Sequence, residues 1–285
     1  MSDDPGSDDR VSDDRANAGE RRRWNDERWT SVWPRRERFT DAVTPRLLDA
    51  LALTPGERVL DIGCGGGKAT IEAGRRVGPQ GSAIGADLSV PLVELARRRA
   101  REAAADNVTF QVVDMQQDTV PGRPFDAAMS QFGVMFFEEP VTAFVNIARH
   151  LRVDGRVVFA CWQSIDRNPW FVASALAPFL PPVAPPAEGK SPTGPFALAD
   201  PDRTAGIMRD ARFSAIRRTP IELTVDLPED SIIDDDQLEF MGVSERDMPA
   251  ARRAVDEHMS PFRQSAEISR FPLSFQIFEA RLARP

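Results

Sequence analysis

The stretch VLDIGCGGGKAT, from Val59 to Thr70, joins an apolar run to a helical segment through a turn that contains four glycines. Glycine accepts backbone conformations that other residues avoid, and it lets a ligand lie directly against the main chain. Several kinds of nucleotide-like ligand bind at such turns. The spacing of the glycines and of the nearby acidic residues must therefore show which of these ligands the turn binds.

The turn does not fit the two common phosphate-binding patterns. The nucleoside triphosphate pattern GxxxxGK[ST] fails because Ile62 stands at its first glycine and Ala69 at its hydroxyl position. The dinucleotide pattern GxGxxG fails because its third glycine is replaced by Lys68 in one register and by Thr70 in the other. A nicotinamide-dependent oxidoreductase is therefore disfavoured, although it remains the nearest alternative enzyme.

Short apolar segments alternate with helical segments from residue 58 onward. The expected strands are 58–62, 82–87, 108–113, 125–130 and 156–162. The expected helices between them are 68–77, 90–104 and about 140–151. This alternation, with short turns, predicts an α/β fold with a parallel, doubly wound sheet.

The N-terminal region divides into two parts. Residues 1–19 repeat Ser-Asp-Asp and have little to bury, so we expect a disordered acidic tail before a single domain over 20–285. Residues 20–55 are expected to form helices, one of them from about Glu37 to Leu53. Trp24, Trp29 and Trp33 are four or five residues apart and can share one helical face. They either pack this region onto the core or form a lid that touches a ligand.

The C-terminal region interrupts the βα pattern twice. After the core at 56–165, a segment over 166–200 is rich in proline and contains a short helix near 171–177. The segment 201–285 is expected to hold a helix at 201–210, strands at about 212–226 and 271–282, and a helical insertion at about 227–268. Both insertions should lie over the carboxyl ends of the strands, where α/β folds bind ligands.

The composition narrows the class of partner. The 285 residues carry a net charge of −8, so no overall basic field attracts nucleic acid or an anionic membrane. Neither an apolar run of about 18 residues nor a signal peptide is recognisable, and both Cys64 and Cys161 lie in expected core segments. We expect a cytoplasmic protein without a membrane span.

Acidic residues end three successive predicted strands. Asp61 precedes the glycines, Asp87 ends the second strand, and Asp114 with Met115 follows the third. S-adenosylmethionine has an ammonium for the first carboxylate, ribose hydroxyls for the second and an adenine amino group for the third, while Met115 covers the ring. Alternatively, each acid caps the helix that follows it.

These residues resemble the class I S-adenosylmethionine-dependent methyltransferases, particularly the small-molecule branch of the ubiquinone and menaquinone C-methyltransferases. The resemblance extends from about Glu57 to Trp170. It implies a Rossmann-like sheet of about seven strands with the last one antiparallel, a helical N-terminal lid, and insertions after strands 5 and 6. It also implies S-adenosylmethionine as cofactor, S-adenosylhomocysteine as product, and no metal.

The resemblance assigns twelve residues to the cofactor: Asp61, Gly63, Cys64, Gly65, Asp87, Leu88, Asp114, Met115, Gln116, Ser130, Gln131 and Phe132. Two positions depart from the family pattern. Gln131 stands where these relatives have arginine, and Val153-Asp154-Gly155 replaces a Pro-Gly-Gly turn. The first departure points to a different acceptor or lid contact.

The sequence says less about the acceptor, because methyl transfer from a sulfonium needs alignment more than acid–base chemistry. The segment SQFGVMFF (130–137) lacks the [DNS]PP[YFW] pattern of nucleobase methylation, so we expect a hydrophobic small molecule, methylated at O, N or C. Glu138 and Glu139 are the only acidic residues near this segment, which is too few for the clustered acids of a metal-dependent site. The expected acceptor contacts are Trp29, Trp33, Val134, Met135 and Trp162.

Two histidines were weighed as a general base. His258 lies in the second insertion and is the candidate, whereas His150 ends a helix and is expected to be structural. A protein that binds the cofactor without transferring a methyl group stays open as an alternative. A homo-oligomer also stays open.

Overall fold

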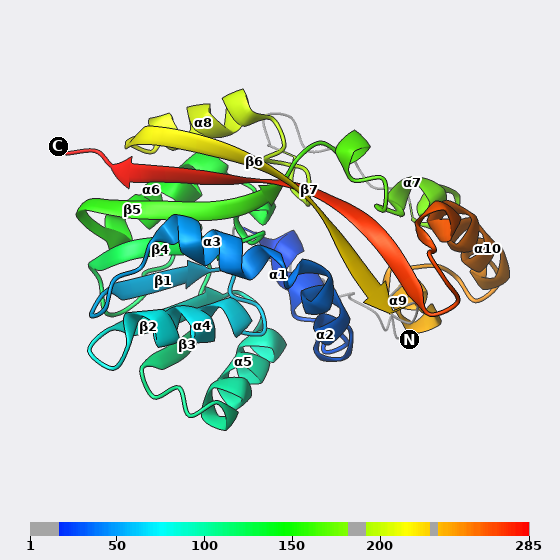
Figure 1. Ribbon diagram of the computed structural model, residues 1–285, viewed down its shortest axis with the longest axis horizontal. Helices are drawn as coiled ribbons and strands as arrows, with labels where there is room; N and C mark the ends of the chain where they lie inside the picture. Colours follow the sequence, from blue (N-terminus) through cyan, green and yellow to red (C-terminus); the bar gives the residue numbers. More distant parts are fainter. Residues whose placement is uncertain (1–16, 182–191, 229–232, 285) are drawn as a thin grey trace, which may run out of the picture.

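The computed structural model describes residues 17–181, 192–228 and 233–284 (Figure 1). Seven strands form one sheet in the order β3-β2-β1-β4-β5-β7-β6. β7 is antiparallel to both of its neighbours, whereas the pairings among β1 to β5 are parallel. The predicted Rossmann-like sheet with an antiparallel last strand is confirmed. The strands are β1 (Arg58–Ile62), β2 (Ser82–Asp87), β3 (Val108–Val112), β4 (Phe125–Gln131), β5 (Leu151–Trp162), β6 (Phe213–Pro228) and β7 (Ile268–Leu282).

The helices cover both faces of this sheet. The strand order reverses at β1, and right-handed crossovers therefore put the helices after β1 and β2 on one face and the helix after β4 on the other. These helices are α4 (Lys68–Val77), α5 (Val90–Glu102) and α6 (Pro140–His150), with α8 (Pro201–Asp210) packed beside α6. Local signals fix their ends. Ser89 caps α5 by accepting the Leu92 N–H, and Asp200 caps α8.

The N-terminal region differs from its prediction in two ways. α1 (Ala18–Trp24) begins before residue 20, and Asn17 is only 1% exposed, so the predicted tail ends too late; residues 1–16 lie outside the described residues. The single helix expected from about 37 to 53 is divided into α2 (Trp29–Thr40) and α3 (Val43–Leu51). The Thr40 carbonyl accepts from the Gln131 side chain at 3.4 Å, which anchors this break to the end of β4.

β5 begins five residues earlier than expected. Its register against β4 shifts between Phe125 and Ala127, and Asp154 adopts a φ of 60°. Residues that read as a turn in the sequence are therefore an irregular part of the strand.

The strands β6 and β7 extend past the rest of the sheet. β7 pairs with β5 only from Phe275 to Arg281, but it pairs with β6 along its whole length. The remainder is a two-stranded arm, formed by residues 222–228 and 268–274, that reaches toward α9 and α10 in Figure 1. Around it lie α7 (Ala173–Leu176), α9 (Asp235–Phe240) and α10 (Met248–Met259).

A second core joins the two insertions at this arm. Val172 and Leu176 from the first insertion share a buried cluster with Val255 and Met259 from the second. The two insertions therefore pack against each other. None of the described helices has the length and apolarity needed to cross a bilayer.

Candidate active site

Three carboxylates lie at the carboxyl ends of β1, β2 and β3. Asp61 and Asp114 are each only 1% exposed, and all three residues line one cavity of about 390 Å³. This volume is within the range of roughly 300–1,000 Å³ that is usual for small-molecule sites. We call Asp61, Asp87 and Asp114 the acid rim.

The glycine turn is held against the acid rim by main-chain hydrogen bonds. The Gly63 and Cys64 N–H groups donate to the Ala86 carbonyl at 2.8 and 3.2 Å. Asp87 accepts from Gly65 N–H at 2.8 Å, so this carboxylate also fixes the turn. Gly63 has a φ of 65°, and a Cβ there would lie 2.7 Å from Gly133 Cα. A side chain at this position would separate the turn from the loop after β4.

Asp61 is a buried carboxylate whose negative charge is stabilised by few partners. The Thr70 hydroxyl donates to it at 2.6 Å, and the structure gives it no ion pair with any described residue. Burial raises the pKa of Asp61 to about 7, the Thr70 hydrogen bond opposes the rise, and the neighbouring Asp87 carboxylate adds to it. Burial also raises the pKa of Asp87, although the Ser89 and Gly65 N–H groups oppose that.

These two acids suit a cationic ligand. A buried carboxylate without a counter-ion is costly, and a bound ammonium removes much of that cost. The amino-acid end of S-adenosylmethionine supplies an ammonium beside a sulfonium, so the donor set fits this cofactor. Within the described ranges no cluster of three or more His, Cys, Asp or Glu is arranged to hold a metal ion.

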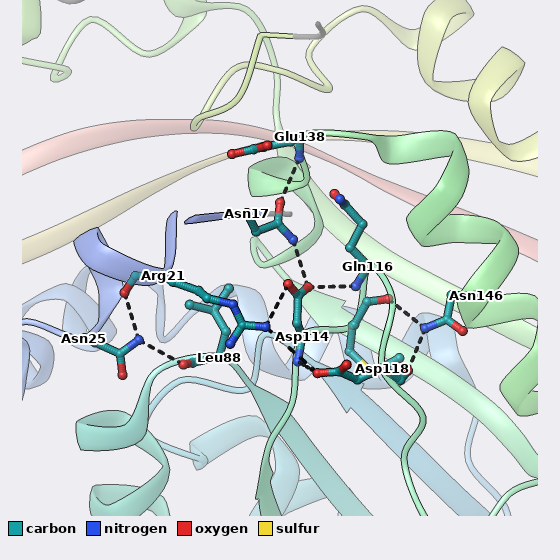
Figure 2. A network of polar contacts seen from close by, with 10 residues as sticks. Asn17, Arg21, Asn25, Leu88, Asp114, Gln116, Asp118, Glu138 and Asn146 are labelled. Atoms are coloured by element: carbon teal, nitrogen blue, oxygen red, sulfur yellow. Dashed lines mark hydrogen bonds and ion pairs between the residues drawn. The ribbon is translucent and has the colours of Figure 1, made fainter. Parts of the chain in front are cut away.

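Asp114 is held by the N-terminal segment (Figure 2). Asn17 Nδ2 donates to one carboxylate oxygen at 2.8 Å, and Arg21 Nη2 donates to the other at 3.2 Å. The Gln116 N–H also donates to this carboxylate at 3.0 Å. The Asn17 side-chain oxygen accepts from Glu138 N–H at 3.4 Å. A carboxamide amino group thus occupies an oxygen that we expected to accept from adenine.

Helices α1 and α2 lie over the acid rim, and we call them, together with Asn17 at the start of α1, the cap (residues 17–40). Asn25 donates to the Leu88 carbonyl at 3.1 Å, and Ser89 Oγ donates to the Trp24 carbonyl at 2.5 Å. The rings of Trp24 and Trp29 stack with centroids 4.5 Å apart. The Trp33 ring lies directly against Gly65, where an added Cβ would come within 2.1 Å of it.

The two alternatives for the tryptophans are therefore not exclusive. Trp24 and Trp29 are 9% and 5% exposed and pack against each other, as a structural role requires. Both also line the cavity, together with Trp33. They belong to two helices, α1 and α2, instead of one helical face.

Another part of the cavity lining is aromatic, and we call it the aromatic wall. The rings of Phe132 and Trp162 stack with centroids 4.1 Å apart and planes 10° apart. Phe39 meets Trp170 at 4.5 Å, with the planes inclined at 66°. Gln131, next to Phe132, connects this wall to α3, because the Thr44 hydroxyl of α3 donates to the Gln131 side-chain oxygen at 2.9 Å. The wall consists of Phe39, Phe132, Trp162, Trp170 and Phe271.

Most of the predicted site residues line the cavity, and four from the region of the strand ends do not. Val134 is 1% exposed and belongs to the main core, whereas its neighbour Met135 lines the cavity. Ser130 uses its hydroxyl to donate to the Ile62 carbonyl at 2.7 Å, so it supports the glycine turn from below. Gln116 accepts from Glu139 N–H at 2.9 Å. Gly65 is covered by Trp33.

His258 does not line the cavity either. Met259 faces the cavity, and the next residue along a helix points about 100° away. The His258 Nε2 atom is buried and has no hydrogen-bond partner among the described residues. This placement argues against His258 as a general base in the described conformation.

His150 is structural, as expected. Its Nε2 accepts from Val120 N–H at 2.9 Å, and its Nδ1 lies 2.8 Å from the Asn146 carbonyl. Burial lowers its pKa, so it is a neutral packing residue near pH 7.

Sequence reasoning missed several residues of the site. Asn17 falls within the predicted tail, and Phe39 falls within the helix expected from about residue 37 to 53. Trp170 stands in the proline-rich segment, and Phe271 begins a predicted strand whose place beside the cavity no local pattern shows. Arg36 carried no motif, yet it lines the cavity.

Comparison with known proteins agrees with this geometry. Residues 59–155 match the family model described as a methyltransferase domain. The chain is 37% identical over 137 residues to aklanonic acid methyltransferase DauC of Streptomyces sp. (strain C5), an alignment that covers 48% of this chain and 59% of that relative. The chain thus spans less than two thirds of that relative's length.

Solved structures share the fold at low sequence identity. The YcgJ protein of Bacillus subtilis superposes with a TM-score of 0.57 at 17% identity, over 86% of this chain and all of that one. The [4+2]-cyclase SpnF superposes with a TM-score of 0.53 at 20% identity, over 86% of this chain and 81% of its own. Residues 59–155 are therefore similar to a methyltransferase domain, and the chain shares its fold with these solved structures.

Proposed function

We propose that the protein transfers a methyl group from S-adenosylmethionine to a hydrophobic small-molecule acceptor at O, N or C. The observation that carries the proposal is the pair Asp61 and Asp87. Asp61 is buried and Asp87 is half-buried beside the glycine turn, and the remaining lining of their cavity is largely apolar, with many aromatic rings. A cationic donor and an apolar acceptor can share such a cavity.

The residues of the cavity have separate tasks in this proposal. The bound cofactor supplies the electrophilic methyl group on its sulfonium. Asp61 holds the ammonium of its amino-acid end, and Asp87 accepts from the ribose hydroxyls. The stacked rings of Phe132 and Trp162 orient the acceptor and exclude water. Alignment in a dry site is sufficient for an in-line displacement, so no general base is assigned.

Similarity to aklanonic acid methyltransferase supports an organic acceptor of this kind. We extend that name only to the class of acceptor, a small secondary metabolite or a quinone-like molecule. Nucleic acid is not part of the proposal, because the net charge of −8 offers no basic surface.

Binding and turnover test the proposal separately. Calorimetric titration should give tight binding of S-adenosylhomocysteine and none of NAD. Incubation with S-adenosylmethionine labelled in the methyl group and a pool of hydrophobic metabolites should then label at least one of them. Binding of NAD in place of S-adenosylhomocysteine would refute the proposal.

A second candidate is cofactor binding without methyl transfer. It is favoured by the fold shared with a [4+2]-cyclase, because one fold can support unrelated reactions. This candidate predicts that S-adenosylhomocysteine binds while every metabolite stays unlabelled.

A further inference from the structure

Most charged side chains that line the cavity beyond the acid rim are paired. Glu37 accepts from Arg99 at 2.8 Å, and Lys68 donates to Asp41 at 2.6 Å. Arg35 pairs with Asp234 at the start of α9. These groups neutralise one another and leave no charge for a ligand.

Arg36 is the exception among the charged lining residues outside the acid rim. No carboxylate of a described residue lies within ion-pairing distance of its guanidinium, and no hydrogen bond from it to a described residue is present. Instead, the guanidinium lies 5.8 Å from the ring centroid of Trp24 and 5.5 Å from that of Trp29. Cation–π contacts of this kind hold the group in place but leave its N–H donors free for a ligand.

The surroundings of Arg36 destabilise its positive charge, which favours the binding of an anion beside it. Its side chain lines the cavity and is exposed to solvent. Partial loss of hydration against neighbouring protein atoms and, to a lesser extent, the nearby Arg23 guanidinium together lower the pKa of Arg36 to about 10. The group therefore stays protonated at neutral pH. An anion beside it would recover much of the lost stabilisation.

Arg36 and Asp61 serve different parts of the cavity. Arg36 lies on α2 against the rings of Trp24 and Trp29, whereas Asp61 lies at the end of β1 and accepts from Thr70. The ammonium and the carboxylate of the cofactor's amino-acid end share one carbon atom. A cofactor whose ammonium is held at Asp61 therefore leaves Arg36 for a different anion.

We propose that Arg36 binds an anionic group, a carboxylate or an ionised phenol, on an aromatic acceptor. This inference rests on the proposed function and specifies its substrate class. The planar guanidinium can form two parallel hydrogen bonds to a carboxylate, which lysine cannot reproduce. The rings of Trp24, Trp29 and the aromatic wall would contact the apolar body of the same molecule.

The test compares two probes of equal shape, 2-naphthoate and 2-naphthamide, on the full chain saturated with S-adenosylhomocysteine. Quenching of tryptophan fluorescence reports binding directly, because Trp24 and Trp29 flank Arg36. The wild-type protein should bind the carboxylate at least roughly ten times more tightly than the amide, as expected for a charge-assisted hydrogen-bonded pair. Equal affinity for the two probes would overturn the inference, and this comparison requires no variant.

Variants then assign the preference to one side chain. Arg36→Gln should abolish the preference for the carboxylate, and Arg36→Lys should retain part of it. Arg38→Gln is the matched control, because Arg38 is on the same helix but does not line the cavity. A preference that survives Arg36→Gln would assign the anion to another residue and overturn the inference.

Titration with S-adenosylhomocysteine alone separates the two proposals. If the wild-type protein does not bind it, the proposed function fails. If it binds and the carboxylate preference is absent, only the inference about Arg36 fails. If Arg36→Gln weakens this binding more than tenfold while the carboxylate preference persists, Arg36 holds the cofactor's own carboxylate and the acceptor inference is overturned.

Discussion

The acid rim and the cap meet in one cavity but are built differently. The acid rim consists of side chains at the ends of adjacent strands, and its turn is fixed by neighbouring main-chain groups such as Ala86 and Gly65. The cap is fixed by contacts between distant segments, such as that of Asn17 with Asp114 across 97 residues. In the proposed function, the rim would provide the charge for a cofactor, and the cap would select what reaches it.

The largest expected effect is that of Asp87→Ala, which attacks the rim itself. Removing this carboxylate takes away the acceptor for two ribose hydroxyls and releases the Gly65 N–H. S-adenosylhomocysteine should bind at least roughly 100-fold more weakly, since each hydrogen bond to a charged group contributes about 1.5–3 kcal/mol. Calorimetry measures this, with the exposed Asp49→Asn as control. Wild-type affinity would count heavily against the assignment of the rim.

Two alanine substitutions separate packing from binding within the cap. Trp29 is 5% exposed and packs on Trp24 and Phe240, so Trp29→Ala should lower the free energy of unfolding by about 3 kcal/mol. Trp33→Ala should cost less stability but weaken S-adenosylhomocysteine binding severalfold, because its ring lies on the glycine turn. Denaturant titration and calorimetry measure the two effects. Equal losses of stability with unchanged binding would reduce the cap to a packing element.

Asp61→Asn should have opposite effects on binding and stability. The pKa of Asp61 is about 7 in the folded chain, against about 3.9 when unfolded, so the folded state favours the protonated form. Its contribution to stability is therefore fully present below about pH 4 and is lost as the pH rises through 7. The variant should unfold at a higher temperature than the wild type at pH 8, with the difference shrinking toward pH 4.

Binding provides the second half of that test. The ionised form of Asp61 is the one that pairs with an ammonium, so wild-type affinity for S-adenosylhomocysteine should rise from pH 6 to pH 8. Asp61→Asn should bind about tenfold more weakly at pH 8 and lose most of this pH dependence. A wild-type affinity that falls over this range would contradict the role of Asp61.

The smallest effect is expected for Asn17→Ala, which loosens the cap from the rim. The Asn17 amino group occupies an oxygen of Asp114 that the adenine amino group is proposed to use. Removing it should tighten S-adenosylhomocysteine binding about threefold, in line with roughly 0.5–1.5 kcal/mol for one hydrogen bond. Weaker binding would mean that Asn17 keeps its place beside the bound cofactor.

The same contrast explains how much the sequence could predict. The bounds of β1, β2, α4 and α8 agree with their predictions, because periodicity, turn glycines and capping residues are local signals. The acidic residues at three strand ends could be recognised for the same reason. The break between α2 and α3 was not predicted, and the Gln131 side chain, about 90 residues away along the chain, donates to the Thr40 carbonyl at this break.

The direction in which side chains point within a short element could not be predicted from the sequence either. Val134 and Met135 are adjacent and both apolar, yet a single turn of 3-10 helix (Val134–Phe136) turns only Met135 toward the cavity. The site residues of the cap, Asn17 and Arg36, are polar residues whose importance comes from distant partners. No pattern along the chain marks such residues.

The two-stranded arm of β6 and β7 gives the molecule a modular architecture. The arm connects the second core to the sheet through strands that are already anchored by β5 from Phe275 onward. The segment between Pro228 and Ile268 therefore begins and ends at neighbouring positions. Exchanging it for a segment of different length would reshape the far side of the cavity while the strand ends that carry the carboxylates stay in register. New acceptor preferences could evolve, or be engineered, through that exchange alone.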